Sequence, residues 1–130
     1  MKKTIMLFAG TTEGRRICEF LAVKKCITHV YVTTEYGKEL LPGQNNVHIH
    51  VGKMDEKQMS DEIKAIHPDI VIDATHPYAT QVTHNIKEAC DSRHIFYVRV
   101  LREENIEKAG NNADNIIYTE TMKDAVRLLN

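Results

Sequence analysis

The feature that most constrains this fold is a short apolar run that ends at a glycine and leads directly into a helical pattern. Residues 4–9 form the run and Gly10 follows it. Such continuous apolar character is typical of a parallel strand covered by helices on both faces. From Thr12 onward, Ile17, Phe20 and Leu21 recur at helical spacing. A strand that leads straight into a helix indicates an α/β arrangement.

The rest of the chain repeats this alternation. Strands are predicted near 30–33, 47–51, 69–73, 95–100 and 116–118, and helices over 55–66 and 80–93. Asp55, with Gln58 three residues later, is expected to cap the first of these helices, and Pro68 to end it. Tyr36 and Gly37 are expected to break the second strand and begin a short irregular stretch. The order predicts a Rossmann-like, doubly wound α/β fold with a mostly parallel sheet and helices on both faces.

At 130 residues, 42% of them apolar, the chain is expected to form one domain, residues 1–130, around one core. Residues 105–115 are expected to form a surface loop. An amphipathic helix is predicted at the end of the chain from Met122, Ala125, Val126 and Leu129. It runs into the terminus without a cap or a glycine stop, so we expect that a second domain has been cut away.

Composition favours a small-molecule partner. The net charge is −1 and the charged residues are spread along the chain, which argues against nucleic acid and against a membrane surface. The first apolar run is too short for a signal peptide or a membrane span, so a cytoplasmic protein is expected. Cys18, Cys26 and Cys90 form no C-x-x-C pair and are expected to be inert reduced thiols, and no Cys/His cluster has metal-ligand spacing.

Three loops after predicted strands carry the residues of chemical interest, because ligands of a parallel α/β sheet lie beyond the carboxyl ends of its strands. The first loop is Gly10-Thr11-Thr12-Glu13-Gly14-Arg15. Its backbone N–H groups, the two threonine hydroxyls and Arg15 are expected to receive a phosphate, and a branched side chain at Gly14 is expected to stand where the phosphate and its tight packing belong. The alternative is a plain turn capped by Thr11 or Thr12.

The second loop is Thr33-Thr34-Glu35-Tyr36-Gly37, at the position where a dinucleotide's ribose is read. A carboxylate at the end of this strand would bind the 2′-hydroxyl of NAD, whereas Thr33 and Thr34 suit the 2′-phosphate of NADP. Glu35 lies one step further and leaves both cofactors possible. The alternative is a turn built on Tyr36 and Gly37.

The third loop is Asp73-Ala74-Thr75-His76-Pro77-Tyr78-Ala79. Pro77 moves His76 out of the helical region, so the His76 ring and the Tyr78 phenol are candidate proton donors or substrate contacts. Asp73 is a candidate buried residue that orders the loop. The alternative for His76 is a structural or solvated histidine, the interpretation we also give to His48 and His50, which alternate on a strand.

Other nucleotide and hydrolase folds are excluded by their missing residues. A Walker loop needs Gly-Lys-Ser/Thr, a receiver domain places an acidic pair after its first strand, and a hydrolase elbow needs G-x-S-x-G; none is present.

Together the three loops resemble the precorrin-6A reductase family, including its cobalt-precorrin form. The matching segments are residues 8–15, 34–37 and 71–79, and the likeness continues through 97–102, so it covers nearly the whole chain. Ala9 departs from the family pattern, in which a glycine is common there. Members of the family have two Rossmann-like domains, with NADPH and a tetrapyrrole held between them.

The resemblance implies an NADPH-dependent reduction of precorrin-6A or cobalt-precorrin-6A in cobalamin biosynthesis, with this chain as the nucleotide-binding half. It implies cofactor binding by Gly10, Thr11, Thr12, Glu13, Gly14, Arg15, Thr34, Glu35, Tyr36, Asp73, Ala74, Thr75, Pro77 and Ala79, and catalytic roles for His76 and Tyr78. Arg99 and Arg102 are either contacts for substrate carboxylates or are solvated or paired with Glu103 and Glu104. The rival hypothesis is a non-enzymatic NAD(P)-binding or sensor domain.

Overall fold

The computed structural model describes residues 2–101 and 116–118. The strands are β1 (Lys3–Phe8), β2 (Cys26–Val32), β3 (Val47–Val51), β4 (Ile70–Asp73), β5 (Phe96–Leu101) and β6 (Ile116–Tyr118). The helices are α1 (Thr12–Ala22), α2 (Glu35–Glu39), α3 (Glu56–Ile66) and α4 (Thr80–Ser92). The expected surface loop at 105–115, the terminal helix with Met122, and Arg102 lie outside these residues.

All six strands run parallel in one sheet, in the order β3-β2-β1-β4-β5-β6. The chain moves outward from β1 to β3, crosses back to β4 beside β1, and then moves outward on the other side. This confirms the predicted Rossmann-like, doubly wound fold. The order reverses between β1 and β4, and ligands of such sheets bind at that switch point, beyond the carboxyl ends of the strands.

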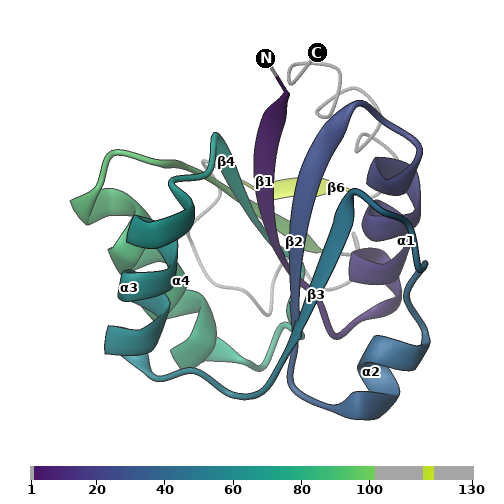
Figure 1. Cartoon of the computed structure of the whole chain (residues 1–130). Coiled ribbons are helices and arrows are strands. Elements are labelled where there is room, and N and C mark those ends of the chain that lie inside the picture. Colours follow the sequence, from purple (N-terminus) through teal and green to yellow (C-terminus); the bar gives the residue numbers. More distant parts are fainter. Residues whose placement is uncertain (1, 102–115, 119–130) are drawn as a thin grey trace.

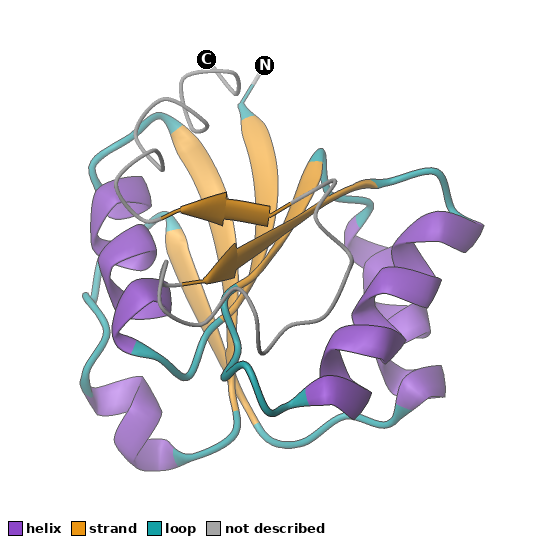
Figure 2. Cartoon of the chain, turned by 180° about the vertical axis from the view of Figure 1, so that it is seen from behind, coloured by secondary structure: helices purple, strands orange, loops and turns teal. Residues whose placement is uncertain are grey.

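Helices cover both faces of the sheet, with α1 and α2 on one side and α3 and α4 on the other (Figures 1 and 2). Successive side chains of β1 point to opposite faces. Ile5 and Leu7 pack in the cluster with α1, whereas Met6 and Phe8 pack in the cluster with α3 and α4. Because β1 is buried on both faces, it must be apolar at every central position, which is why its sequence shows no alternation.

The start and end of α3 follow the sequence signals. The Asp55 side chain accepts a hydrogen bond from the Gln58 N–H, and the Gln58 side chain accepts one from the Asp55 N–H, so the expected capping box is present. His67 then adopts a left-handed conformation, with φ of 51°, directly before Pro68. The helix therefore ends where the proline requires it to end.

Two predictions were wrong: the start of the second strand and the structure of the stretch that follows it. The strand begins at Cys26 rather than Val30, because residues 26–29 pair with β1 from Lys3 to Met6. The stretch expected to be irregular contains the short helix α2, for which Thr34 is the N-cap: its hydroxyl accepts from the Gly37 N–H at 3.0 Å. A polar cap thus starts a helix through Tyr36 and Gly37.

The three cysteines are buried and free. Burial raises the pKa of both Cys18 and Cys90 to about 12. A thiolate is the reactive form of cysteine, so these two thiols remain protonated and unreactive near neutral pH. This agrees with the prediction of inert reduced thiols at Cys18 and Cys90.

Candidate functional site

A hollow of about 620 Å³ opens at the carboxyl ends of β1 and β2. It lies between the loop that enters α1, the end of β2 with α2, and the loop that follows β4. Nine of the predicted site residues line it: Gly10, Thr11, Thr12, Glu13, Arg15, Thr34, Tyr36, His76 and Pro77. Gly14, Glu35, Asp73, Ala74, Thr75, Tyr78 and Ala79 are not in its lining. The structure therefore brings together parts of all three predicted loops.

The loop between β1 and α1 has the geometry of a helix entry that faces the hollow. Gly10 adopts φ of +131°, a conformation that side-chain-bearing residues rarely take. Thr11 follows in extended conformation as the N-cap, and its hydroxyl accepts from the Gly14 N–H at 3.1 Å. The first-turn N–H groups and the positive end of the helix dipole thus lie at the edge of the hollow, an arrangement suited to an anion.

The expected role of the Thr11 hydroxyl was wrong. Its single proton is donated to the Ala74 carbonyl at 2.6 Å, so this hydroxyl ties the first loop to the third instead of donating to a phosphate. A hydroxyl has only one proton to donate. Thr12 also lines the hollow.

The tight packing expected around Gly14 is confirmed, whereas Gly14 itself does not line the hollow. A Cβ placed on Gly14 would lie 2.9 Å from the Ala9 Cβ and 3.5 Å from the Ala74 Cβ. A side chain here would therefore meet the residue after β1 and the loop after β4. Gly14 is therefore needed for the close approach of α1 to β1 and the β4 loop, and the departure from the family at Ala9 supplies the methyl group against which it packs.

The end of β2 presents hydroxyls and apolar surface to the hollow. Thr33 and Thr34 line it. Glu35, the carboxylate that left the choice between NAD and NADP open, does not. Leu40 and Leu41 form an apolar wall that the sequence interpretation missed. They follow directly after α2, and the polar N-cap at Thr34 was the one signal that could have indicated this helix.

The third loop is held by a buried carboxylate. Asp73 is fully buried at the end of β4 and accepts hydrogen bonds from the Thr75 N–H at 3.1 Å and the Thr75 hydroxyl at 2.6 Å. Thr83 of α4 and Tyr97 of β5 donate to its other oxygen at 2.7 and 2.8 Å. Burial, and then the negative charge of Asp73, raise the pKa of Tyr97, so its phenol stays a donor. The prediction that Asp73 is a buried hydrogen-bonding residue that orders the loop is confirmed.

Arg99 completes this network, and the sequence interpretation did not place it there. It is 6% exposed and forms an ion pair with Asp73 at 3.3 Å. The two hypotheses for Arg99, a substrate contact or a solvated or Glu-paired cation, are both wrong in this structure. The register of the sheet is the reason, because it places Arg99 of β5 directly beside Asp73 of β4.

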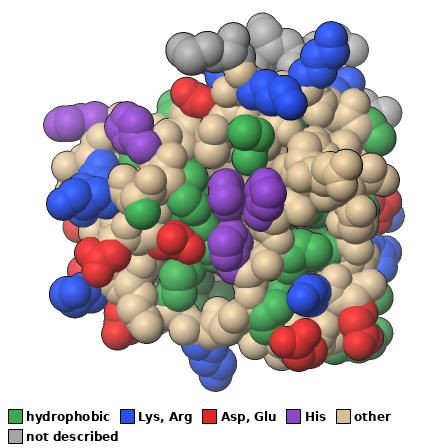
Figure 3. All heavy atoms as spheres, in the orientation of Figure 1, with side chains coloured by type: hydrophobic (Ala, Val, Ile, Leu, Met, Phe, Trp, Pro, Cys, Tyr) green, Lys and Arg blue, Asp and Glu red, His purple; other side chains and the backbone are tan. Residues whose placement is uncertain are grey.

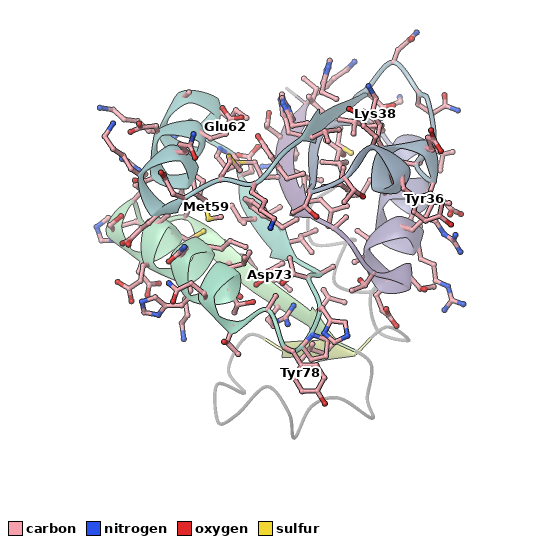
Figure 4. The ribbon with its side chains drawn as sticks, turned by 90° about the horizontal axis from the view of Figure 1, so that it is seen from below. Tyr36, Lys38, Met59, Glu62, Asp73 and Tyr78 are labelled. Atoms are coloured by element: carbon pink, nitrogen blue, oxygen red, sulfur yellow. The ribbon has the colours of Figure 1, made fainter. Side chains whose placement is uncertain are left out.

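His76 and Tyr78 are exposed residues of the same loop, and Figure 4 shows where Tyr78 lies. The Nδ1 atom of His76 accepts from the Tyr78 N–H at 3.2 Å, which leaves the proton of a neutral ring on Nε2. The two rings are 5.1 Å apart, and Tyr78 is 65% exposed, with its ring pointing outward in Figure 4. Of the two candidates, His76 is the one that lines the hollow.

A group of histidines gathers at the centre of the face drawn in Figure 3. His29 stacks on His48 and His50, and its Nδ1 lies 3.0 Å from Nε2 of His50. Burial, with the two neighbouring histidines, lowers the pKa of His29. None of the three lines the hollow, in keeping with the structural interpretation of His48 and His50. Within 2–101 and 116–118 no cluster of three or more His, Cys, Asp or Glu could hold a metal ion.

No helix among the described residues has the length and apolar character needed to cross a membrane.

The fold itself has known counterparts. A solved structure of CobK precorrin-6A reductase superposes with a TM-score of 0.66 over 78% of this chain and 39% of that one, at 24% identity. The Bordetella bronchiseptica enzyme WbmG, solved with NAD and UDP, gives 0.64 over 79% of this chain and 38% of that one, at 15% identity. At these identities the likeness bears on the fold alone.

The sequence comparisons identify the family to which the chain belongs. Residues 4–130 match the family described as precorrin-6x reductase CbiJ/CobK. Cobalt-precorrin-6A reductase of Methanocaldococcus jannaschii is 34% identical over 95% of this chain and 48% of its own length. The same enzyme of Salmonella typhimurium is 30% identical over 88% of this chain and 42% of its own length. The chain thus spans less than half the length of these relatives, and it belongs to the precorrin-6x reductase family.

Proposed function

We propose that this chain is the nucleotide-binding part of an NADPH-dependent reductase that acts on cobalt-precorrin-6A or its cobalt-free counterpart in cobalamin biosynthesis. The observation that carries the proposal is the hollow at the switch point of the sheet, where the loops after β1, β2 and β4 meet. Its shape and lining suit a dinucleotide, and the names of the relatives supply the substrate class.

Each loop has a separate part in holding the cofactor. The N-terminus of α1, with Gly10 and Thr12, would receive the pyrophosphate, and Arg15 would pair with an anionic oxygen. Thr33 and Thr34 would face the 2′-phosphate of the adenosine ribose, where a carboxylate would repel it. When bound, NADPH supplies a hydride to the substrate.

His76 is the residue that we place nearest the chemistry. With Nδ1 engaged by the Tyr78 N–H, the Nε2–H of His76 is the group that can donate a hydrogen bond or a proton toward a molecule in the hollow. Tyr78 contacts His76 and would act through it or on the macrocycle directly. We further propose that a second domain covers the tetrapyrrole, because the described loops form only one wall of a site.

Calorimetric titration with NADPH and NADH tests the cofactor assignment. NADPH should bind at least about tenfold more tightly, equivalent to about 1.4 kcal/mol. Equal or tighter binding of NADH would contradict the role of the two threonines and would make Glu35 a ribose contact.

Adjacent arginines provide a matched pair for the phosphate assignment. Arg15→Gln should weaken NADPH binding by about tenfold, since a charge-assisted hydrogen bond is worth roughly 1.5–3 kcal/mol. Arg16→Gln removes the same charge from an exposed position outside the hollow and should change the affinity less than about twofold. Equal effects of the two variants would mean that the phosphates do not lie at this loop.

A further inference from the structure

One buried side chain holds the backbone of the third loop at successive points. Arg99 donates from Nη1 to the Asp73 carbonyl at 3.1 Å and to the Thr75 carbonyl at 2.8 Å, and from Nη2 to the His76 carbonyl at 3.3 Å. These three carbonyls cover the path from the end of β4 to the edge of the hollow. A planar guanidinium can serve all of them at once, whereas an ammonium group cannot hold that fixed fork.

The charge of Arg99 is balanced inside the network. Asp73, fully buried, is its ion-pair partner at 3.3 Å and is itself fixed by Thr75, Thr83 and Tyr97. A buried ion pair is a poor source of stability, because apolar residues of the same volume often serve equally well. What an apolar pair could not supply is the set of bonds to the loop carbonyls.

The loop segment whose carbonyls Arg99 binds, residues 73–76, leads to the residues that face the hollow. His76 and Pro77 line it, and the His76 carbonyl also accepts from the Ala79 N–H at 2.9 Å, which closes the turn before α4. The Ala74 carbonyl, within the same segment, accepts the Thr11 hydroxyl proton and so links this loop to the entry of α1. Movement of the segment would therefore displace both walls of the hollow.

We propose that Arg99 is a positioning residue that sets the His76 side of the nucleotide hollow by fixing the carbonyls of Asp73, Thr75 and His76. The proposal rests on the assignment of this hollow to NADPH. Arg99 does not line the hollow and acts through the loop backbone.

The test compares Arg99→Lys with Tyr97→Phe in the purified chain. Tyr97→Phe removes one hydrogen bond to the buried Asp73 carboxylate, and the Tyr97 hydroxyl makes no bond to the loop carbonyls. Arg99→Lys keeps the positive charge beside Asp73 but removes the fork that holds the loop carbonyls. Amide hydrogen exchange, followed by NMR, reads the loop through the Tyr78 and Ala79 N–H groups, whose acceptors are His76 Nδ1 and the His76 carbonyl. Amides of β1 provide the reference for the rest of the fold.

In Arg99→Lys, exchange at Tyr78 and Ala79 should accelerate relative to β1 by about fivefold or more, the factor that corresponds to about 1 kcal/mol for a lost hydrogen bond. NADPH affinity should fall by a similar factor. Tyr97→Phe should leave the ratio of loop to β1 exchange, and the affinity, within about twofold. If both variants change the ratio equally, or if neither does, Arg99 has only a structural part and the inference is overturned.

Two further outcomes separate this inference from the proposed function. If Arg99→Lys does not fold, the wild-type chain still decides: Tyr78 and Ala79 amides that exchange as fast as a free peptide would overturn the inference. If the loop responds as expected in the absence of nucleotide but wild type binds no NADPH, Arg99 fixes the loop and the nucleotide assignment fails. If wild type binds NADPH and the loop does not respond to Arg99→Lys, only the role of Arg99 fails.

Discussion

Adding one methyl group at Gly14 should destabilise the fold through a contact with Ala9. A Cβ at Gly14 would lie 2.9 Å from the Ala9 Cβ and 3.0 Å from the Ala9 Cα, against an optimal carbon separation of about 3.5–4.0 Å. Overpacking of this kind costs about 1–3 kcal/mol. Removing a glycine from a helix returns up to about 1 kcal/mol, so Gly14→Ala should lower the free energy of unfolding by about 1–2 kcal/mol.

A double variant isolates the contact. Ala9→Gly removes the nearer methyl, so Gly14→Ala combined with Ala9→Gly should be more stable than the sum of the two single changes predicts, by about 1 kcal/mol. The rescue is partial, because the Ala9 Cα remains 3.0 Å away. Gly43→Ala is the control: a Cβ there meets nothing within 4 Å, so it should be neutral or stabilising by up to about 1 kcal/mol.

Urea denaturation followed by circular dichroism measures all four variants. The reasoning is refuted if Gly14→Ala is as stable as Gly43→Ala, or if the effects at positions 9 and 14 simply add. Either result would mean that α1 does not pack on β1 as closely as this structure places it.

Three further outcomes are expected. Gly10→Ala should cost about 1–2 kcal/mol in the unfolding free energy, because φ of +131° strains any side-chain-bearing residue, and weaker NADPH binding should accompany it; unchanged stability and affinity would exclude this loop geometry. Burial raises the pKa of Tyr97 and Tyr31 in the folded state, so only the unfolded chain ionises these phenols above pH about 10. Stability in urea melts should therefore be intact below that pH and fall above it, with a shallower slope in Tyr97→Phe; an identical slope would contradict the raised pKa. In a reductase assay, residues 1–130 alone should not turn over precorrin-6A or its cobalt complex until the second domain is supplied, because positioning of the two reactants supplies much of such a rate; turnover at the rate of the two-domain protein would place the whole active site within Gly10 to Arg102.

The sheet and three of its helices were predictable because each element leaves a local pattern of apolar residues, continuous in the buried strands and periodic in the helices. β1 is apolar throughout, α3 carries Met59 and Ile63 on one face with its capping box, and each signal is local in sequence. The helix α2 was missed because it left no such pattern. It is only five residues long, contains Gly37 and buries no residue, so it has no apolar period to detect.

The site was predicted as three loops but not as a set of contacts. Its loops follow from the rule that ligands lie beyond parallel strand ends. The direction of Gly14 depends on where Ala9 lies across the helix–strand interface, and the burial of Arg99 depends on the register that places it beside Asp73. Arg99 and Asp73 are 26 positions apart, whereas Ala9 and Gly14 are close in sequence and meet only because α1 packs back on β1. Neither relation leaves a local pattern.

The hydrogen bond from Thr11 to the Ala74 carbonyl joins residues that are 63 positions apart. Local helices can form early in folding, but this contact requires that β4 has already docked beside β1. A nascent chain that has not yet delivered β4 therefore lacks one wall of the hollow, however well α1 has formed. A nucleotide that binds the completed hollow would then stabilise only chains in which β4 has docked beside β1. Its binding would therefore favour the completed fold over partly folded chains.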